Sequence, residues 1–326
     1  MKLFWLGFSS LLSEMHEHGF TENKLVDLPN ARALDWQEVC AEAGFVPDVL
    51  VYADSSLPPP LVGLERFPCV TCFYAIDTHI HSWYPLWARA FDCAAVSLRD
   101  HLADFEREMG AQRTMWLPPY PRSWHIPKWE EEKKWDVLFA GKVDPELTPE
   151  RQRFLSELQE LLPGAVHVTQ GSFRDIFPQA RIVLNVAERG DLNLRVFEAL
   201  ACGSCLLTPD VGHGQDELFT PGEYFEVYEN LNAEDAAGKI TALLADPQRC
   251  EALARAGHAL IEKAHRTHHR AISLAELLNS DHVAEARAAR LQRTTQDKAV
   301  RAVYLHWAEE LPDSELRRKY LEAALG

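Results

Sequence analysis

The sequence predicts two Rossmann-like, doubly wound α/β domains in tandem, followed by a C-terminal helical extension. Three observations lead to this fold class. Short apolar segments alternate with amphipathic ones, a proline-dense segment interrupts the pattern, and the alternation then begins again. The last part of the chain shows helical patterns only. We expect domains over residues 1–130 and 131–275 and a helical tail over residues 276–326.

The first domain is expected to hold a parallel sheet covered on both faces, because its strands are apolar along their whole length. Expected strands cover residues 3–6, 49–52, 69–74, 93–96 and 114–117, and expected helices cover residues 36–43, 84–90 and 100–109. Four prolines then fall within ten residues, from Pro118 to Pro127. Because such density prevents regular structure, this segment is predicted to link the domains.

The second domain repeats the alternation. Expected strands cover residues 135–140, 165–168, 181–186 and 204–208, and expected helices cover residues 148–162, 194–202, 233–244 and 247–264. Two doubly wound domains in tandem are predicted to face a crevice at the carboxyl ends of their strands, where ligands bind in this architecture.

The tail contains helical patterns over residues 298–310 and 314–324 and resembles one tetratricopeptide-type hairpin. A single such unit cannot bury its apolar face alone. We therefore expect it to pack on the domains of its own chain, with packing on a partner chain as the alternative.

Composition narrows the function classes. The 326 residues are 47% hydrophobic and 25% charged, as in ordinary globular proteins. A formal net charge of −16 argues against a nucleic-acid partner. The apolar start resembles a short signal peptide but lacks a cleavage site, so it is interpreted as a buried first strand, and no segment reaches the length of a membrane span. Together with seven cysteines, an odd number, this predicts a cytoplasmic protein with reduced thiols.

Two Cys-x-x-Cys pairs, Cys69/Cys72 and Cys202/Cys205, invite a zinc interpretation. Each pair overlaps a predicted strand, where residues three apart point to opposite faces, whereas a zinc knuckle needs a tight turn. We predict buried thiols instead. The histidines at 265, 268 and 269 have metal-like spacing but are interpreted as structural, so no metal site is predicted.

The segment that carries chemistry surrounds the start of the expected helix 194–202. Asn193 or Asp191 can cap this helix, and Arg195 lies in its first turn, where unsatisfied backbone N–H groups favour an anion. The helix dipole does not stabilise a cation at this end, so a diphosphate bound at the same helix end would explain why an arginine is found there. Glu198 lies one turn below and can accept hydrogen bonds from two ribose hydroxyls. The alternative is a surface ion pair of Arg195 and Glu198, which would contribute little.

The run 181–208 resembles the donor-binding signature of GT-B glycosyltransferases, specifically the CgeB-like (spore-maturation protein) group. Residues 193–203 fit the Asn-x-Arg-x-Phe-Glu-Ala-x-Ala-Cys-Gly segment of that group. The resemblance implies a GT-B fold and a hexosyltransferase-type enzyme that uses a nucleotide-sugar. It assigns donor binding to Asn193, Arg195, Phe197 and Glu198.

Other stretches agree with this resemblance. Residues 135–142 resemble the first strand of the donor domain, which adds Gly141 and Lys142 to the donor site, with Lys142 as a second phosphate contact. Residues 76–81, 116–118, 216–219, 222–223 and 265–270 also fit, so the resemblance covers about residues 70–275 well. One departure concerns the sugar contact, because Gly190 stands where many such enzymes carry a second Glu.

In the implied reaction the leaving group is a nucleoside diphosphate. Arg195, Lys142 and the helix N-terminus would stabilise its charge without a metal, and no cofactor beyond the nucleotide-sugar co-substrate is expected. Three candidates follow the expected strand 69–74, namely Asp77, His79 and His81. Any of them could take the proton of the acceptor hydroxyl or hold the sugar. The alternative for each is a structural role at a helix cap.

Two other functions compete with sugar transfer. A nucleotide-sugar epimerase or hydrolase would turn over without an acceptor, and a non-catalytic nucleotide-binding scaffold would use the helical tail for docking. The acceptors compatible with transfer are a protein such as flagellin, a surface glycan and a small metabolite. The tail favours a protein acceptor or another protein partner.

Overall fold

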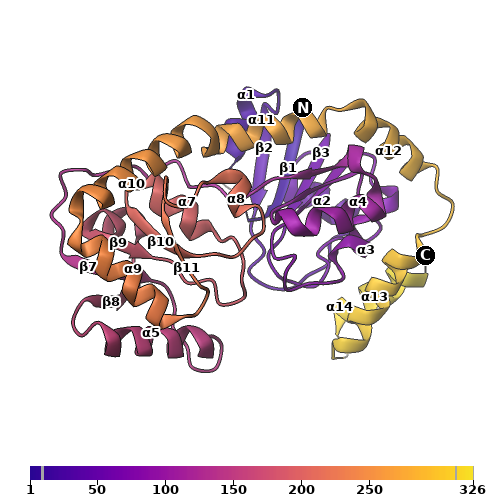
Figure 1. The fold of residues 1–326 in the computed structure, drawn as a ribbon. Helices are drawn as coiled ribbons and strands as arrows, with labels where there is room; N and C mark the ends of the chain where they lie inside the picture. The colour runs from indigo at the N-terminus through magenta and orange to yellow at the C-terminus, as the bar shows by residue number, and fades with distance from the viewer. Residues whose placement is uncertain (9–10, 313, 326) are drawn as a thin grey trace. The chain divides into compact units, whose positions relative to one another are not determined.

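The computed structural model describes residues 1–8, 11–312 and 314–325. Contacts divide the chain into two compact units, Met1–Pro118 with Arg270–Gly326 and Pro119–His269 (Figure 1). The boundaries expected after residues 130 and 275 differ from this division in two stretches. Residues 119–130 group with the second unit, and residues 270–275 group with the first. The C-terminal helices therefore complete the first unit.

The first unit is built on a six-stranded parallel sheet in the order β2-β1-β3-β4-β5-β6. Its strands are β1 (Lys2–Gly7), β2 (Glu22–Val26), β3 (Val49–Ala53), β4 (Val70–Ala75), β5 (Cys93–Val96) and β6 (Thr114–Trp116). Its first four helices are α1 (Leu12–Glu17), α2 (Trp36–Ala43), α3 (Tyr84–Ala88) and α4 (Leu102–Met109) (Figure 1). All five expected strands are confirmed, and β1, β3, β4 and β5 are almost wholly buried.

Two elements of this unit differ from expectation. Strand β2 was not predicted, because Glu22–Val26 is mostly exposed and carries none of the apolar pattern used to find the other strands. Helix α1 was not among the expected helices either. A buried Met15 anchors this short helix.

Strand β1 lies between β2 and β3, so the strand order reverses at β1 and β3. In such sheets the ligand crevice opens at the carboxyl ends of these two strands. Gly7 ends β1 with φ +93°, and a Cβ there would lie 2.0 Å from the carbonyl oxygen of Ala53. Only glycine permits this close approach of the two strand ends.

The second unit holds a five-stranded parallel sheet in the order β11-β10-β9-β7-β8. Its strands are β7 (Trp135–Ala140), β8 (Val166–Thr169), β9 (Ala180–Leu184), β10 (Cys205–Pro209) and β11 (Glu226–Tyr228). Its helices are α5 (Pro149–Leu161), α6 (Phe173–Ile176), α7 (Leu194–Ala201), α8 (Gln215–Leu218), α9 (Ala233–Ala245) and α10 (Pro247–Leu260) (Figure 1). The four expected strands are confirmed, and the order reverses at β7 and β9.

The proline-dense segment has no helix or strand between Trp116 and Trp135, as predicted. Its residues from Pro119 onward nevertheless pack on the second unit. His125 is buried, and its carbonyl accepts a hydrogen bond of 2.7 Å from Nη1 of Arg266. Pro127 and Trp129 cover the end of α7, where Gly203 adopts φ +69°.

A Gly203→Ala change is expected to destabilise the second unit by roughly 2–5 kcal/mol. The added Cβ would meet a left-handed backbone and would lie 2.7 Å from the Trp129 ring and 2.9 Å from Pro127. Gly164→Ala is the matched control, because its φ is +78° and a Cβ there meets nothing within 4 Å. Urea unfolding of both variants should show the larger loss for Gly203→Ala. Equal losses would mean that the contact with Trp129 does not matter.

The C-terminal helices pack on the first unit. Helices α12 (Asp281–Leu291), α13 (Lys298–Glu310) and α14 (Glu315–Leu325) follow α11 (Thr267–Leu278). Six side chains of α13 and α14 belong to the first unit's core, namely Val300, Val303, Tyr304, Ala308, Tyr320 and Ala324. This confirms the expected packing within the chain.

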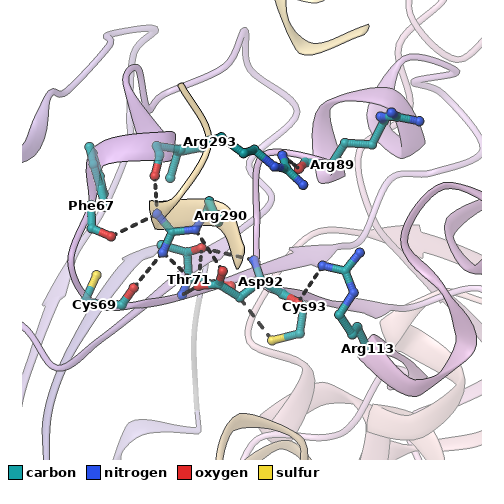
Figure 2. A network of polar contacts seen from close by, with 10 residues as sticks. Phe67, Cys69, Thr71, Arg89, Asp92, Cys93, Arg113, Arg290 and Arg293 are labelled. Atoms are coloured by element: carbon teal, nitrogen blue, oxygen red, sulfur yellow. Dashed lines mark hydrogen bonds and ion pairs between the residues drawn. The ribbon is translucent and has the colours of Figure 1, made fainter. Parts of the chain in front are cut away.

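Helix α12 is attached by a buried ion pair between Arg290 and Asp92, which are 2% and 0% exposed (Figure 2). Arg290 Nε lies 2.8 Å from Asp92 Oδ1, and Nη2 lies 2.9 Å from Oδ2. The remaining N–H groups of Arg290 donate to the carbonyls of Leu64, Phe67 and Cys69. All five donors of the guanidinium are therefore used.

The four cysteines of the two Cys-x-x-Cys pairs are buried free thiols, as predicted. Within the ranges that the structure covers, no group of three or more His, Cys, Asp or Glu side chains is placed to hold a metal ion. None of the helices in those ranges combines the length and apolar character that crossing a bilayer requires.

Candidate functional site

The carboxyl ends of β7 and β9 bring the predicted donor residues together in the second unit. Gly141 and Lys142 follow β7, Asn185 follows β9, and Arg195 lies in the first turn of α7. Arg195 Nη1 donates to Asn185 Oδ1 at 3.0 Å. Asn185 is itself held in place, because its Nδ2 donates to Thr208 and its carbonyl accepts from Tyr228. Asn185 is a site residue that the sequence reasoning did not name.

The half-buried Arg195 guanidinium lies against two aromatic rings. Its Cζ lies 5.1 Å from the centroid of Phe139 and 5.8 Å from that of Phe173. Burial lowers the pKa of Arg195 to about 10. Its Nε is buried and has no hydrogen-bond partner among the described residues. A cation with an unused buried donor is costly unless an anion compensates it.

No carboxylate in the described part of the chain forms an ion pair with Arg195. Glu198 lies near His125 instead. The alternative of a surface pair between Arg195 and Glu198 is therefore wrong. Glu198 is only 8% exposed and Arg195 is half-buried, so neither side chain lies on a fully solvated surface. A phosphate group could engage Arg195 by charge-assisted hydrogen bonds.

Gly141 provides the space that Arg195 occupies. A Cβ at this position would lie 2.9 Å from Arg195 Nη2 and 3.1 Å from the Phe139 ring. Lys142 is 63% exposed and lies 3.0 Å from Asp144, so it is available at the rim rather than enclosed. Arg151, which sequence reasoning missed, places a second guanidinium 5.8 Å from the Phe139 centroid.

Glu198 faces His125 from the proline-dense segment. Glu198 Oε1 lies 3.9 Å from Nε2 of His125, which is 4% exposed. The backbone N–H of Arg122 donates to His125 Nδ1 at 3.2 Å, so the ring proton is on Nε2, toward Glu198. Burial raises the pKa of Glu198 to about 7 and lowers that of His125 to about 4. At no pH are both charged in large part, so they do not form an ion pair.

The raised pKa of Glu198 predicts a pH-dependent stability. A fold that favours the protonated carboxyl is most stable below the unfolded pKa and loses that advantage as pH rises through about 7. Between pH 4.5 and pH 8, we expect the free energy of unfolding of Glu198→Gln to rise by about 3 kcal/mol relative to that of the wild type. His125 has the opposite dependence but is common to both proteins. Urea unfolding across this range measures the difference, and a constant difference would contradict the assigned pKa.

Asn193 and Phe197 occupy different environments from each other. Asn193 is the N-cap residue of α7, but its side chain accepts no hydrogen bond from the helix, and its Oδ1 is buried without a partner among the residues described. Phe197 is 0% exposed and packs against Phe219 and His265. It has no surface to offer a ligand, so it would contribute to donor binding only by fixing α7.

In the first unit, the three acceptor-side candidates follow β4. Asp77 and His81 are brought together by Ser56, whose hydroxyl donates to Asp77 Oδ2 and lies 3.2 Å from His81 Nε2. His79 does not join them, and its Nδ1 is buried without a hydrogen-bond partner in the described ranges. Asp54, the first residue after β3, accepts a hydrogen bond from the backbone N–H of Asp77 at 2.8 Å.

Comparisons with known proteins show which family and which solved structures the chain resembles. Residues 122–279 match the model of a family described as glycosyl transferase-like. HepE from Anabaena, solved with UDP and glucose, aligns with 85% of this chain and 99% of its own at a TM-score of 0.59 and 11% identity. Sucrose-phosphate synthase from Thermosynechococcus elongatus aligns with 85% of this chain and 98% of its own at 0.57 and 12% identity. The chain has the GT-B fold.

This GT-B chain spans only 55% of the length of TarM, another solved structure it resembles, which aligns with 71% of this chain at a TM-score of 0.54 and 11% identity. A comparison with curated protein sequences finds no match. The predicted fold class is confirmed, because both sheets are parallel and covered by helices, and HepE and sucrose-phosphate synthase each align with 85% of the chain.

Proposed function

We propose that the protein transfers a sugar, of the hexosyl type, from a nucleoside-diphosphate sugar to an acceptor hydroxyl. The observation that carries the proposal is Arg195, a cation at the strand-order reversal of the second unit with a buried donor atom and no carboxylate partner in the described chain. The match of residues 122–279 to a glycosyl transferase-like family supports it independently.

In this proposal the second unit binds the donor. Arg195 and Lys142 stabilise the charge that develops on the leaving diphosphate, together with the uncapped N-terminus of α7. Glu198 accepts hydrogen bonds from the ribose hydroxyls. Because these cations supply the charge stabilisation, we propose that no metal is required, and that added EDTA leaves turnover unchanged.

On the acceptor side, Asp77 and His81 of the first unit handle the proton of the attacking hydroxyl. We further propose, from the segment 193–203, that the enzyme belongs to the CgeB-like group, and that it is a cytoplasmic protein that modifies a protein or a surface glycan. HepE was solved with UDP-glucose, so this is the first donor to test.

A thermal-shift screen against UDP, GDP, dTDP, CMP and their common sugars tests donor binding. A nucleotide at a hundred times its dissociation constant should add about 2.7 kcal/mol of apparent stability. We expect a shift with one nucleotide that Arg195→Ala abolishes. Arg255→Ala is the matched control, since Arg255 also lies over a ring, that of Trp129 at 4.7 Å, but belongs to α10.

Two outcomes of the screen would count against the proposal. A shift that survives in Arg195→Ala would place the nucleotide elsewhere, and no shift with any nucleotide would favour a protein that binds no donor. The scaffold alternative has less structural support than the sequence suggested, because its docking helices α13 and α14 bury their apolar side chains in the first unit.

A further inference from the structure

The acceptor-side residues of the first unit are organised around an exposed serine in an uncommon backbone conformation. Ser56 has φ +52°, in the left-handed region that few non-glycine residues adopt. Its backbone N–H donates to Asp54 Oδ1 at 2.8 Å, which closes a tight turn after β3. This turn directs the Ser56 hydroxyl toward the loop after β4, where it reaches Asp77 and His81.

Asp54 and the C-terminal helices hold this turn from both sides. Asp54 is 3% exposed and accepts hydrogen bonds from the Tyr84 hydroxyl and from the backbone of Ser56 and of Asp77. Past the turn, the hydroxyls of Tyr320 and Tyr304 donate to the carbonyls of Pro59 and Leu61 at 2.8 and 2.9 Å. The left-handed conformation of Ser56 is thus imposed by its surroundings.

Counting hydrogens fixes the direction of each bond in the cluster. A serine hydroxyl has one proton, and Ser56 donates it to Asp77 Oδ2. The Ser56 oxygen therefore presents a lone pair to His81, so this hydrogen bond requires a proton on Nε2 of His81. The hydroxyl of Ser56 therefore links the Asp77 carboxyl to the His81 imidazole by two hydrogen bonds.

We infer that Ser56 is a positioning residue that couples Asp77 to His81 and fixes the His81 tautomer for uptake of the acceptor proton. This rests on the proposed function. As the acceptor O–H bond breaks, its proton passes to the imidazole, and the oxygen forms a bond to the anomeric carbon. The bond from that carbon to the diphosphate oxygen breaks, and its electron pair leaves with the nucleoside diphosphate. Asp77 stabilises the imidazolium through Ser56.

Ser56→Gly is the sharpest variant. Glycine adopts a left-handed φ freely, so the change removes the hydroxyl while keeping the turn. We expect the melting temperature to stay within a few degrees of the wild type. Ser55→Ala is the matched control, because its hydroxyl lies on the same loop and makes only a 3.5 Å contact with the Ala53 carbonyl.

The tautomer of His81 is read by long-range ¹H–¹⁵N spectra of the full chain labelled at histidine, with His81→Gln assigning the signal. The wild type and Ser55→Ala should show the Nε2–H pattern, and Ser56→Gly should show a mixture of tautomers. A proton on Nδ1 in the wild type, or an unchanged pattern in Ser56→Gly, would overturn the inference.

Hydrolysis of UDP-glucose, with water as the acceptor, gives the kinetic readout. Ser56→Gly should lower kcat for UDP release at least about tenfold and leave KM unchanged. The double variant Ser56→Gly/His81→Gln should have the same kcat as His81→Gln alone. Full kcat in Ser56→Gly would overturn the inference. A wild type that releases no UDP would contradict this donor in the proposed function, while the tautomer still decides the role of Ser56.

Discussion

An Asp92→Ala variant should lose about 3–5 kcal/mol of unfolding free energy, because it leaves the Arg290 guanidinium buried without a counter-charge. Asp92 is 0% exposed and supplies two of the five acceptors of Arg290 (Figure 2). It also accepts from the backbone N–H and the hydroxyl of Thr71, at 2.8 and 3.0 Å. The change thus leaves donors unsatisfied on β4 as well as on α12.

Thermal unfolding measures this loss, which corresponds to a fall of roughly 6–20 °C for a unit of this size. Arg293→Ala is the matched control, because Arg293 lies just beyond α12, is exposed, and donates only at 3.3 Å to the Arg89 carbonyl. The control should differ little from the wild type. If Asp92→Ala has the same melting temperature as Arg293→Ala, the buried ion pair does not hold α12 to the first unit.

An Arg195→Ala variant should lower kcat/KM for sugar transfer by about 10²–10³-fold, the usual cost of removing one preorganised donor to a developing charge. Arg195→Lys should recover only part of it, because lysine keeps the charge but cannot fork between Asn185 and a phosphate. Gly141→Ala should also impair transfer, since its Cβ would displace the guanidinium at Nη2.

Steady-state release of nucleoside diphosphate measures all three variants, with Arg255→Ala as the control for loss of an arginine elsewhere in the unit. The expected order of activity is wild type and Arg255→Ala first, then Arg195→Lys, then Arg195→Ala. Equal turnover in Arg195→Ala and Arg255→Ala would remove Arg195 from the donor site.

The sequence predicted best those helices and strands whose own apolar spacing determines which residues are buried. Strand β7, over Trp135–Ala140, and helix α2, over Trp36–Ala43, have the predicted bounds, because their apolar spacing alone determines them. Strand β2 is polar and lies at the sheet edge, so pairing with β1 rather than its own composition makes it a strand. Strand β11, of three residues, was not predicted either.

The candidate site was predictable only in part, for a related reason. Arg195 and Glu198 were found because helix geometry relates neighbours along one segment. His125 reaches Glu198 from a proline-dense segment far earlier in the chain, and Ser56 reaches Asp77 across 21 positions. Such contacts depend on tertiary packing and leave no local signal. Phe197 shows the reverse case, since a residue within the signature segment turns inward.

The discontinuous first unit has a consequence for the order of folding during synthesis. Arg290 contacts Asp92 across 198 positions, and Tyr320 contacts Pro59 across 261. All residues of the second unit leave the ribosome before these partners do. The second unit can therefore fold while the first still lacks its closing helices, which reverses the usual N-terminal-first sequence. Until then the apolar surface that α13 and α14 later cover stays exposed, which favours aggregation of the nascent first unit.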